Sequence, residues 1–395
     1  MHVRYPIWLR TIERTGSQTF AIMFALESTA RALLSTVIAI QALALLHDAR
    51  NVSLVFSLIG VSGFAASFLV PVLIGRISRR YTYTLGSILL LAAAGLLASL
   101  TVPGQIFGMI IRVFATACLS ITTSLYIMQY ISKRDLTRAE PRRMQYSALA
   151  WTIGPWLGVK IYETLGPDWS YGASAVAALI ALGFFWMMRL RDNPVIQPAN
   201  RPPPNPIKSI GRFLQQPRLR LAWIITFGRS AWWVFFFVYT PLYMIESGFS
   251  REQGALAVSA GNALLFLTPL FGELGSRFGI RKVLTGGFVL AGVATLFAGL
   301  SYHNPYLSLG FLMLAATGCV ALDALGTIPF FRAVHPYERA QMTTVFRTYI
   351  DIAELLTPGL FAILLTVSDL QTVFIVFGGI VASFAIWPKF LPRRM

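Results

Sequence analysis

The chain has 395 residues, of which 56% are hydrophobic and only 12% charged, and its mean hydropathy is +0.64. Because a soluble domain carries about a quarter charged residues, this composition excludes a soluble enzyme or binding module and indicates a polytopic membrane protein. The formal net charge of +17 suggests a nucleic-acid partner at first, but the positions of the basic residues argue against one.

Apolar segments of about 20 residues recur along the whole chain, and this is the length that a helix needs to cross the hydrocarbon core of a bilayer. Prolines inside them are tolerated in a membrane bundle, where neighbouring helices satisfy the freed carbonyls. The sequence therefore predicts an all-α membrane protein with twelve transmembrane helices. In chain order they are 17–46, 51–75, 82–101, 105–131, 144–165, 168–188, 219–246, 252–275, 283–301, 305–331, 341–367 and 370–388.

The basic residues alternate from loop to loop. Of the 33 Lys and Arg, 26 lie in the two tails and one set of alternate loops, and only Arg50 and Arg251 lie in the other set. By the positive-inside rule we expect both termini in the cytoplasm and a multi-pass protein of the cell inner (plasma) membrane. The five that remain lie within spans, and Lys160, beside Glu163, is expected to reach the membrane interface. The other four are Arg31, Arg112, Arg229 and Arg347.

Residues 191–218 are too polar and too rich in proline to span a membrane. They are predicted to form a cytoplasmic linker between an N-terminal six-helix bundle, residues 1–190, and a C-terminal six-helix bundle, residues 219–395. Within the linker, IKSIGRFL is predicted to form a short amphipathic helix whose apolar side, including Ile210 and Phe213, faces lipid. A disordered linker is the alternative.

The two halves repeat each other at a nearly constant offset. Arg31 and Arg229 lie 198 residues apart, Gly75 and Gly272 lie 197 apart, and the methionines that open spans 5 and 11, Met144 and Met342, again lie 198 apart. Two parallel six-helix halves joined by a linker are typical of one large group of secondary transporters.

The segment from Gly272 to Lys282, GELGSRFGIRK, resembles the loop signature of the major facilitator superfamily, and the resemblance extends over essentially the whole chain. Ser276 stands where the family usually has Asp, and the first-half copy, 75–84, has Arg79 there. The alternative is a plain basic turn between helices. The residues that match the signature region are Gly272, Ser276, Arg277, Gly279, Arg281 and Lys282.

Two partial resemblances concern the kind of transporter. Arg112 looks like the buried Arg of proton-coupled family members, and AWTIGPWLG, residues 150–158, is similar to the family's antiporter motif. Gly154, Pro155 and Gly158 in this stretch offer a kink and a close helix contact at which the halves could hinge. Together they favour proton-driven efflux, and a packing kink without functional meaning is the alternative.

Eight ionisable residues lie deep in the spans, four acids and four arginines, and spans 3, 6, 9 and 12 have none. Because a charge facing lipid costs at least about 2.5 kcal/mol, we expect all eight to face the interior or a watery cavity. The family resemblance implies the same placement, with spans 1, 4, 7 and 10 lining the cavity. The predicted proton-coupling residues are Glu27, Arg112, Asp323, Asp351 and Glu354, and a purely structural ion-pair network is the alternative reading. On span 11, Arg347, Asp351 and Glu354 are spaced to share one helical face.

Arg31 and Arg229 are predicted to face each other across the cavity, because the repeat relates spans 1 and 7. Two opposed guanidiniums could clamp a phosphate or carboxylate, an arrangement that resembles the family's organophosphate antiporters. Glu27, one turn from Arg31, could instead pair with it and release it to substrate when protonated. The predicted substrate-binding residues are Arg31, Arg229, Arg347, Trp232, Trp233 and Tyr239; the aromatic ones suit a ring-bearing solute or simple packing equally well.

Other chemistry is poorly supported. Cys118 and Cys319 are expected to be packing residues, the four histidines lie in loops or tails, and the chain lacks nucleotide-binding and hydrolase motifs. No enzyme activity, metal or cofactor is therefore predicted.

We expect a monomeric secondary active transporter of a small organic solute, working by alternating access and by proton-coupled antiport in the export direction. Uptake or exchange of an organic anion is the alternative, and a non-transporting receptor or assembly factor is a distant one. Its partners would be the solute, protons and the lipid bilayer, and no nucleic acid.

Overall fold

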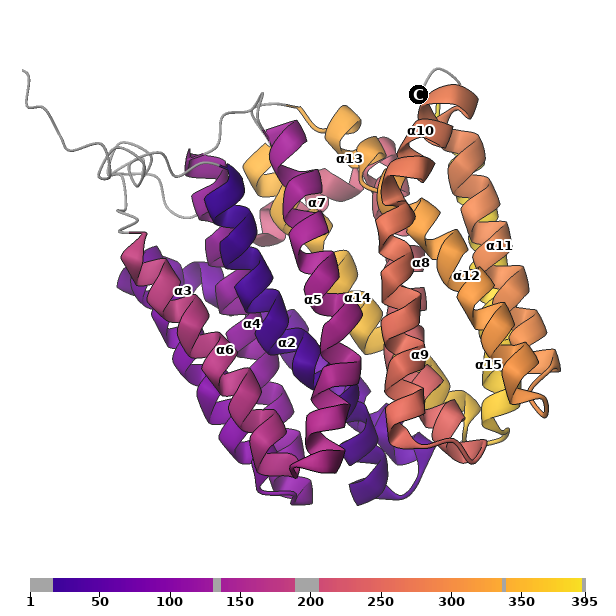
Figure 1. The fold of residues 1–395 in the computed structure, drawn as a ribbon. Helices are drawn as coiled ribbons and strands as arrows, with labels where there is room; N and C mark the ends of the chain where they lie inside the picture. The colour runs from indigo at the N-terminus through magenta and orange to yellow at the C-terminus, as the bar shows by residue number, and fades with distance from the viewer. Residues whose placement is uncertain (1–16, 131–135, 189–205, 336–338, 393–395) are drawn as a thin grey trace, which may run out of the picture.

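The computed structural model describes residues 17–130, 136–188, 206–335 and 339–392, and all regular elements in these ranges are helices (Figure 1). The first half contains five helical elements, which are α2 (Ser17–Leu46), α3 (Ala49–Ala98), α4 (Val102–Tyr130), α5 (Leu136–Thr164) and α6 (Pro167–Met187). A short helix, α7 (Pro206–Leu214), precedes the second half. That half contains α8 (Pro217–Glu246), α9 (Arg251–Ala263), η1 (Leu264–Leu267), α10 (Thr268–Phe278), α11 (Ile280–Leu300), α12 (Pro305–Leu325), α13 (Ile328–Ala333), α14 (Arg339–Leu364), α15 (Leu370–Ser383) and η2 (Phe384–Phe390).

The predicted all-α membrane fold is confirmed, and helices occupy each of the twelve predicted spans. Nine helical stretches of the described residues are long and apolar enough to cross a membrane. One of them, α3, contains two predicted spans, which are separated by a break at Ser78, where φ is 70° and ψ is 162°. The two other spans are α5 and α14, which are not among the nine.

Proline interrupts two of the predicted spans, each of which was expected to be one continuous helix. The span predicted at 252–275 consists of α9, the 3₁₀ turn η1 and α10, and Pro269 lies in the first turn of α10. The span predicted at 305–331 stops at Leu325 and resumes as α13, which has Pro329 in its first turn. Since proline has no N–H to donate and clashes with the preceding turn, the chain restarts its helix at these points.

The helices of each half pack mainly on one another, and three helix pairs make the most extensive contacts between the halves. In the first half α3 packs on α4 and α2 packs on α5 and α6, while in the second half α11 packs on α12 and α15, and α8 packs on α9 and α14. Across the halves α14 packs along α3 and α2 meets α8. Helix α5 packs along α9 (Figure 1). These three contacts place the surfaces of α2, α3, α5, α8, α9 and α14 between the halves.

The two halves share their apolar cores near the loops that carry few basic residues. Ala39, Ala42 and Val52 of the first half belong to the large apolar cluster of the second, and Ala255 of α9 belongs to a cluster of the first. These residues lie close to the ends of α2, α8 and α9 that meet the loops at 47–48 and 247–250. Apolar packing therefore closes this end of the interface between the halves.

The amphipathic helix predicted in the linker is present as α7, but its apolar side faces the protein. Phe213 is only 2% exposed and packs with Leu219 of α8, Phe330 of α13 and Phe346 of α14, whereas Leu214 is exposed. The expectation of a lipid-facing Phe213 was wrong because the ends of α8 and α14 offer an apolar surface that buries this ring completely. Residues 191–205 of the linker lie outside the described residues.

Candidate functional site

Helix α14 presents its polar face to the first half. The Ser67 hydroxyl of α3 donates a hydrogen bond to Oδ2 of Asp351 at 2.6 Å. The Arg347 guanidinium donates to Ser120 Oγ at 2.9 Å and to Ser124 Oγ at 3.2 Å, and both serines lie on α4. The spacing of Arg347, Asp351 and Glu354 thus forms one stripe, as predicted, and the stripe lies across two helices of the other half.

Glu354, the third member of the stripe, faces a pair of arginines. Its carboxylate lies within electrostatic range of Arg112 on α4 and Arg31 on α2, and of Asp351 one turn away. Nη2 of Arg112 donates to the backbone carbonyl of Arg31 at 3.1 Å. The structure therefore brings Glu354 of the second half close to Arg112 and Arg31 of the first half. The three predicted residues form one cluster at the interface between the halves.

Glu27 lies inside the first half. It is only 2% exposed, and its Oε1 accepts hydrogen bonds from the Tyr83 hydroxyl at 2.8 Å and the Thr123 hydroxyl at 2.9 Å. Tyr83 belongs to the second part of α3 and stacks on Phe185 of α6. Glu27 thus joins α2 to α3 and α4. Its two hydrogen bonds offset the cost of removing a carboxylate from water.

Arg229 of α8 forms an ion pair with Asp323 of α12, within the second half. Its Nη2 also donates to the Tyr349 hydroxyl at 3.2 Å, and its guanidinium lies 5.6 Å from the centre of that ring. Trp233 donates its indole N–H to the other oxygen of Asp323 at 2.7 Å. Arg229 was predicted to lie opposite Arg31 across a cavity. Its partners Asp323 and Tyr349, which occupy much of its guanidinium, were not predicted.

Three aromatic rings lie between Arg31 and Asp323. The Arg31 guanidinium lies 6.0 Å from the centre of the Trp151 ring on α5. Trp151 lies 5.4 Å from Phe237 on α8, and Phe237 lies 5.7 Å from Trp233. We call Trp151, Phe237 and Trp233 the aromatic row. The row connects Arg31 of the first half to Asp323 of the second. Trp151 was not among the predicted substrate-binding residues, although it lies inside the antiporter-like stretch, residues 150–158.

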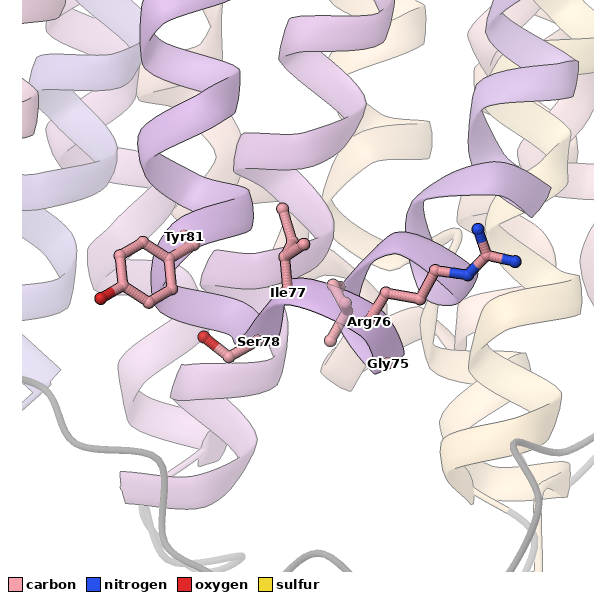
Figure 2. A pocket seen from close by; sticks show the side chains of 6 residues that line it. Gly75, Arg76, Ile77, Ser78 and Tyr81 are labelled. Atoms are coloured by element: carbon pink, nitrogen blue, oxygen red, sulfur yellow. The ribbon is translucent and has the colours of Figure 1, made fainter.

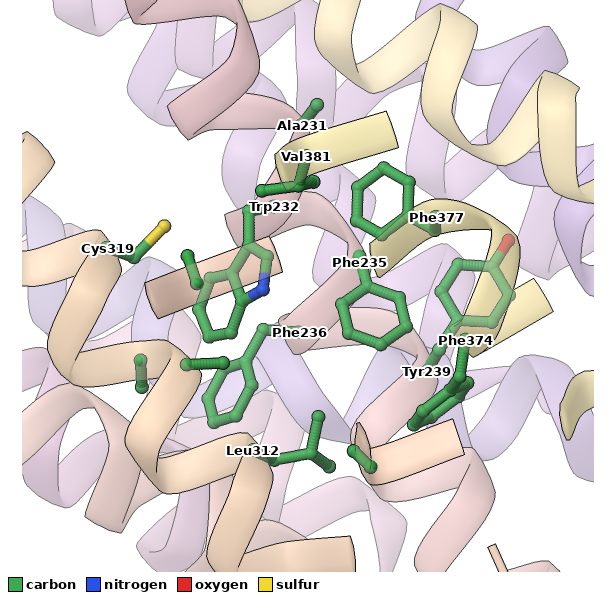
Figure 3. Packing of buried hydrophobic residues seen from close by; sticks show 14 of the residues in the cluster. Ala231, Trp232, Phe235, Phe236, Tyr239, Leu312, Cys319, Phe374, Phe377 and Val381 are labelled. Carbon is green, nitrogen blue, oxygen red and sulfur yellow. The ribbon is translucent and has the colours of Figure 1, made fainter. Parts of the chain in front are cut away.

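Trp232 and Tyr239, two other predicted substrate-binding residues, are fully buried on a different face of α8 (Figure 3). Trp232 stacks on Phe236 and donates its N–H to Thr295 of α11 at 2.8 Å. Tyr239 shares a 2.7 Å hydrogen bond with Ser53 of α3. Their contacts are those of packing residues, so neither is included in the proposed site.

Gly154 and Gly158, the predicted hinge glycines, lie where α5 crosses α2. A Cβ at Gly158 would lie 1.8 Å from the carbonyl oxygen of Leu33, and one at Gly154 would lie 2.6 Å from Cβ of Ala32. Just after Pro155, the backbone N–H of Trp156 donates to Ser259 Oγ of α9 at 3.0 Å. The glycines therefore make a close contact within the first half, while the residue after the proline bonds to the second.

Two ion pairs join α5 to α9 near the loops with few basic residues. Lys160 pairs with Glu252 at 2.9 Å, and Glu163 pairs with Arg251 at 3.2 Å. Trp156 also donates its indole N–H to Glu252. Lys160 was expected to reach the membrane interface beside Glu163, but its partner is an acid of the other half, which sequence spacing within one helix does not reveal.

The loop signature lies at the turn from α10 to α11. Gly279 adopts a φ of 89°, which favours glycine, and Gly275, rather than Gly272, packs against Leu325 of α12. Ser276 donates to the carbonyl oxygen of Glu273, and Arg277 forms an exposed ion pair with Glu273. Arg281 is half-buried and Lys282 exposed. An acid is thus present in this turn, but Glu273 supplies it instead of position 276.

The corresponding turn of the first half has a different geometry. The chain turns at Ser78, and Arg76, Ile77, Ser78 and Tyr81 line a shallow surface pocket there (Figure 2). The φ and ψ of Ser78 fall in a region that is populated almost only by glycine. Within the described parts of the chain, no three His, Cys, Asp or Glu side chains are grouped to hold a metal.

The structure resembles solved transporters over nearly its full length. A POT family transporter in complex with a thioalcohol-conjugated peptide matches with a TM-score of 0.75 and 13% identity, covering 94% of each chain. A peptide transporter POT in complex with sulfate matches at 0.74 and 13%, covering 95% of this chain and 94% of that one. The nucleoside transporter NupG matches at 0.72 and 17%, covering 94% and 98%. At these identities the likeness shows a shared fold.

Sequence similarity gives the family. No curated protein matches the chain. The family model of the Major Facilitator Superfamily, in contrast, matches residues 20–266 and 251–394, which together span nearly the whole sequence. This chain therefore belongs to the Major Facilitator Superfamily and is a multi-pass secondary transporter of small solutes, not an enzyme.

Proposed function

We propose that the chain is a proton-coupled transporter that moves a small organic solute by alternating access. Residues 1–190 and 219–395 act as the two moving halves and residues 191–218 as their cytoplasmic linker, with both termini in the cytoplasm. One observation carries the proposal, namely that the stripe of α14 places Asp351 and Glu354, both ionisable, against groups of the opposite half.

Proton binding at this stripe would change the energy of the interface. A protonated Glu354 loses its attraction to Arg112 and Arg31, and a protonated Asp351 loses its charge beside Arg347. Since a proton can shift a conformational equilibrium only by interacting differently with the two states, carboxylates at the moving interface are suited to coupling. Glu27, which accepts from Tyr83 and Thr123 of its own half, and Asp323, which pairs with Arg229 of its own half, are proposed as secondary proton sites.

The solute would bind between the halves, where Arg31, Trp233, Arg229 and Arg347 come from opposite sides of the interface. We propose antiport in the export direction, supported by the resemblance of residues 150–158 to the antiporter motif. Uptake or exchange of an organic anion is the second candidate. The neighbours named as peptide and nucleoside transporters share only the fold and do not favour an anionic solute.

The experiment is proton flux in proteoliposomes that contain a trapped pH indicator. Anionic metabolites and lipophilic cations are added outside one at a time. Antiport predicts that an active solute makes the lumen alkaline, because protons leave as the solute enters, whereas symport predicts that the lumen becomes acidic. Glu354→Gln should abolish the flux. Glu246→Gln, which changes an exposed acid bonded to Tyr302, is the matched control and should retain it. Absence of proton movement with every solute would contradict the proposal.

A further inference from the structure

The aromatic row differs from the other aromatic side chains of α8 in its exposure. Phe235 and Phe236 are completely buried, as is Trp232, and they form the apolar core of the second half (Figure 3). Trp233 and Phe237 are only partly buried, and so is Trp151 of α5. Helix α8 therefore has one aromatic face that is sealed by packing and a second that is directed toward the first half and remains partly open.

The open rings face the protein interior rather than lipid. Trp151 lies beside the Arg31 guanidinium, and Trp233 donates a hydrogen bond to the Asp323 carboxylate. Because charged groups at this depth avoid hydrocarbon, the sides of the two rings next to these groups face the inside of the bundle. Trp151 and Phe237 come from different halves, so any solute held by the row touches both.

The geometry of the row suits a planar ligand. Trp151 is tilted by 57° and Trp233 by 34° relative to Phe237, so the three rings are not stacked on one another and their faces are not mutually covered. Aromatic rings attract another ring in offset or edge-to-face contact at centroid separations of about 4.5 to 7 Å. A saturated ring of the same size gains only the burial of its surface.

We propose that the transported solute carries a planar aromatic or heteroaromatic ring, which binds against Trp151 and Trp233 between Arg31 and Asp323. The inference rests on the proposed function because it names the class of solute for that same site. Trp151 is then a residue that determines specificity. Its position on α5, opposite Phe237 of α8, makes its contact with the solute dependent on the relative position of the halves.

The test measures equilibrium binding to the purified full chain by the concentration-dependent rise in its unfolding temperature. Three pairs of probes are matched in charge and differ in ring planarity: benzoate with cyclohexanecarboxylate, benzylamine with cyclohexylmethylamine, and phenylalanine with cyclohexylalanine. In at least one pair the aromatic member should bind about tenfold more tightly. Trp151→Leu should remove that preference, and Trp151→Phe should retain most of it.

The matched control is Trp186→Leu, which changes a tryptophan that lies under the Arg80 guanidinium outside the row, and it should keep the preference unchanged. The proposal is overturned if no pair shows an aromatic preference, if none of the six probes binds, or if the preference survives in Trp151→Leu. Binding is measured without any gradient. An aromatic preference in a protein that moves no protons would therefore support this inference while contradicting the proposed coupling.

Discussion

Ser67 and Asp351 lie 284 residues apart in sequence and share a 2.6 Å hydrogen bond that joins α3 to α14 across the two halves. The two partners can be changed separately, because Asn at position 351 still offers an oxygen to Ser67 but carries no titratable charge. The pair therefore allows the contact between the halves to be separated from the charge of Asp351.

For Ser67→Ala we expect a change in transport rate of less than about tenfold, since one hydrogen bond contributes about 1 kcal/mol, and transport that still depends on pH, because Asp351 keeps its titratable charge. For Asp351→Asn we expect a flattened pH profile, because the proton site is lost beside Arg347 and Glu354. Initial rates in proteoliposomes between pH 5 and 8 measure both. An Asp351→Asn profile equal to that of the unmodified chain would show that Asp351 has only a structural role.

The Lys160–Glu252 pair should favour the arrangement in which α5 and α9 lie together. Both side chains are more than a third exposed, so solvent screens their attraction and we expect only a weak coupling. Lys160→Glu and Glu252→Lys should each increase thiol labelling of a cysteine introduced at the adjoining Ala255, which is fully buried here. The double exchange should restore protection, and additive effects of the two changes would argue against a functional contact.

Gly158→Ala should destabilise the protein severely, because the new Cβ would lie 1.8 Å from the carbonyl oxygen of Leu33. Overpacking of this kind costs about 1 to 3 kcal/mol or more, since a backbone atom cannot move aside as a side chain can. Gly172→Ala in α6 is the control, because no atom lies within 4 Å of its Cβ position. Thermal unfolding in detergent measures both. Equal unfolding temperatures for the two variants would disprove close contact between α2 and α5.

Ser78→Gly should stabilise the chain. The backbone conformation of Ser78 costs a side-chain-bearing residue about 1 to 3 kcal/mol, whereas glycine adopts it freely at an entropic cost of about 1 kcal/mol in the unfolded state. We expect a net gain of about 1 kcal/mol and a rise of about 1 to 2 °C in the unfolding temperature. Ser78→Ala cannot relieve the strain and should give no rise, so a gain in both variants would point to another cause.

Much of the arrangement could be predicted from sequence because it follows from helical periodicity and membrane energetics. The spacing of Arg347, Asp351 and Glu354 fixes a common face on α14, and the cost of charge in lipid directs that face inward. The partners of these residues could not be predicted. Ser67 and Ser120 are ordinary residues of apolar helices, and only the packing of α14 on α3 and α4 gives them a role.

Sequence composition also could not predict that adjacent residues of α8 have different roles. Trp232 and Trp233 are neighbours in sequence, so composition cannot distinguish them, yet a rotation of about 100° per residue directs one to Thr295 and the other to Asp323. Likewise, the repeat correctly relates Arg31 to Arg229 by position but does not show that Arg229 already has an acid in its own half.

The stripe on α14 also has a mechanical consequence. Its members engage α3 and α4 and face α2 at the same time, with Arg347 and Asp351 one turn apart on a single rigid helix. Sliding or tilting α14 by a fraction of a turn would lengthen all of these contacts together, so we expect intermediate positions to be disfavoured. We therefore expect α14 to occupy one of two positions relative to the first half. The halves should switch between them in one concerted step rather than pass through partly open forms.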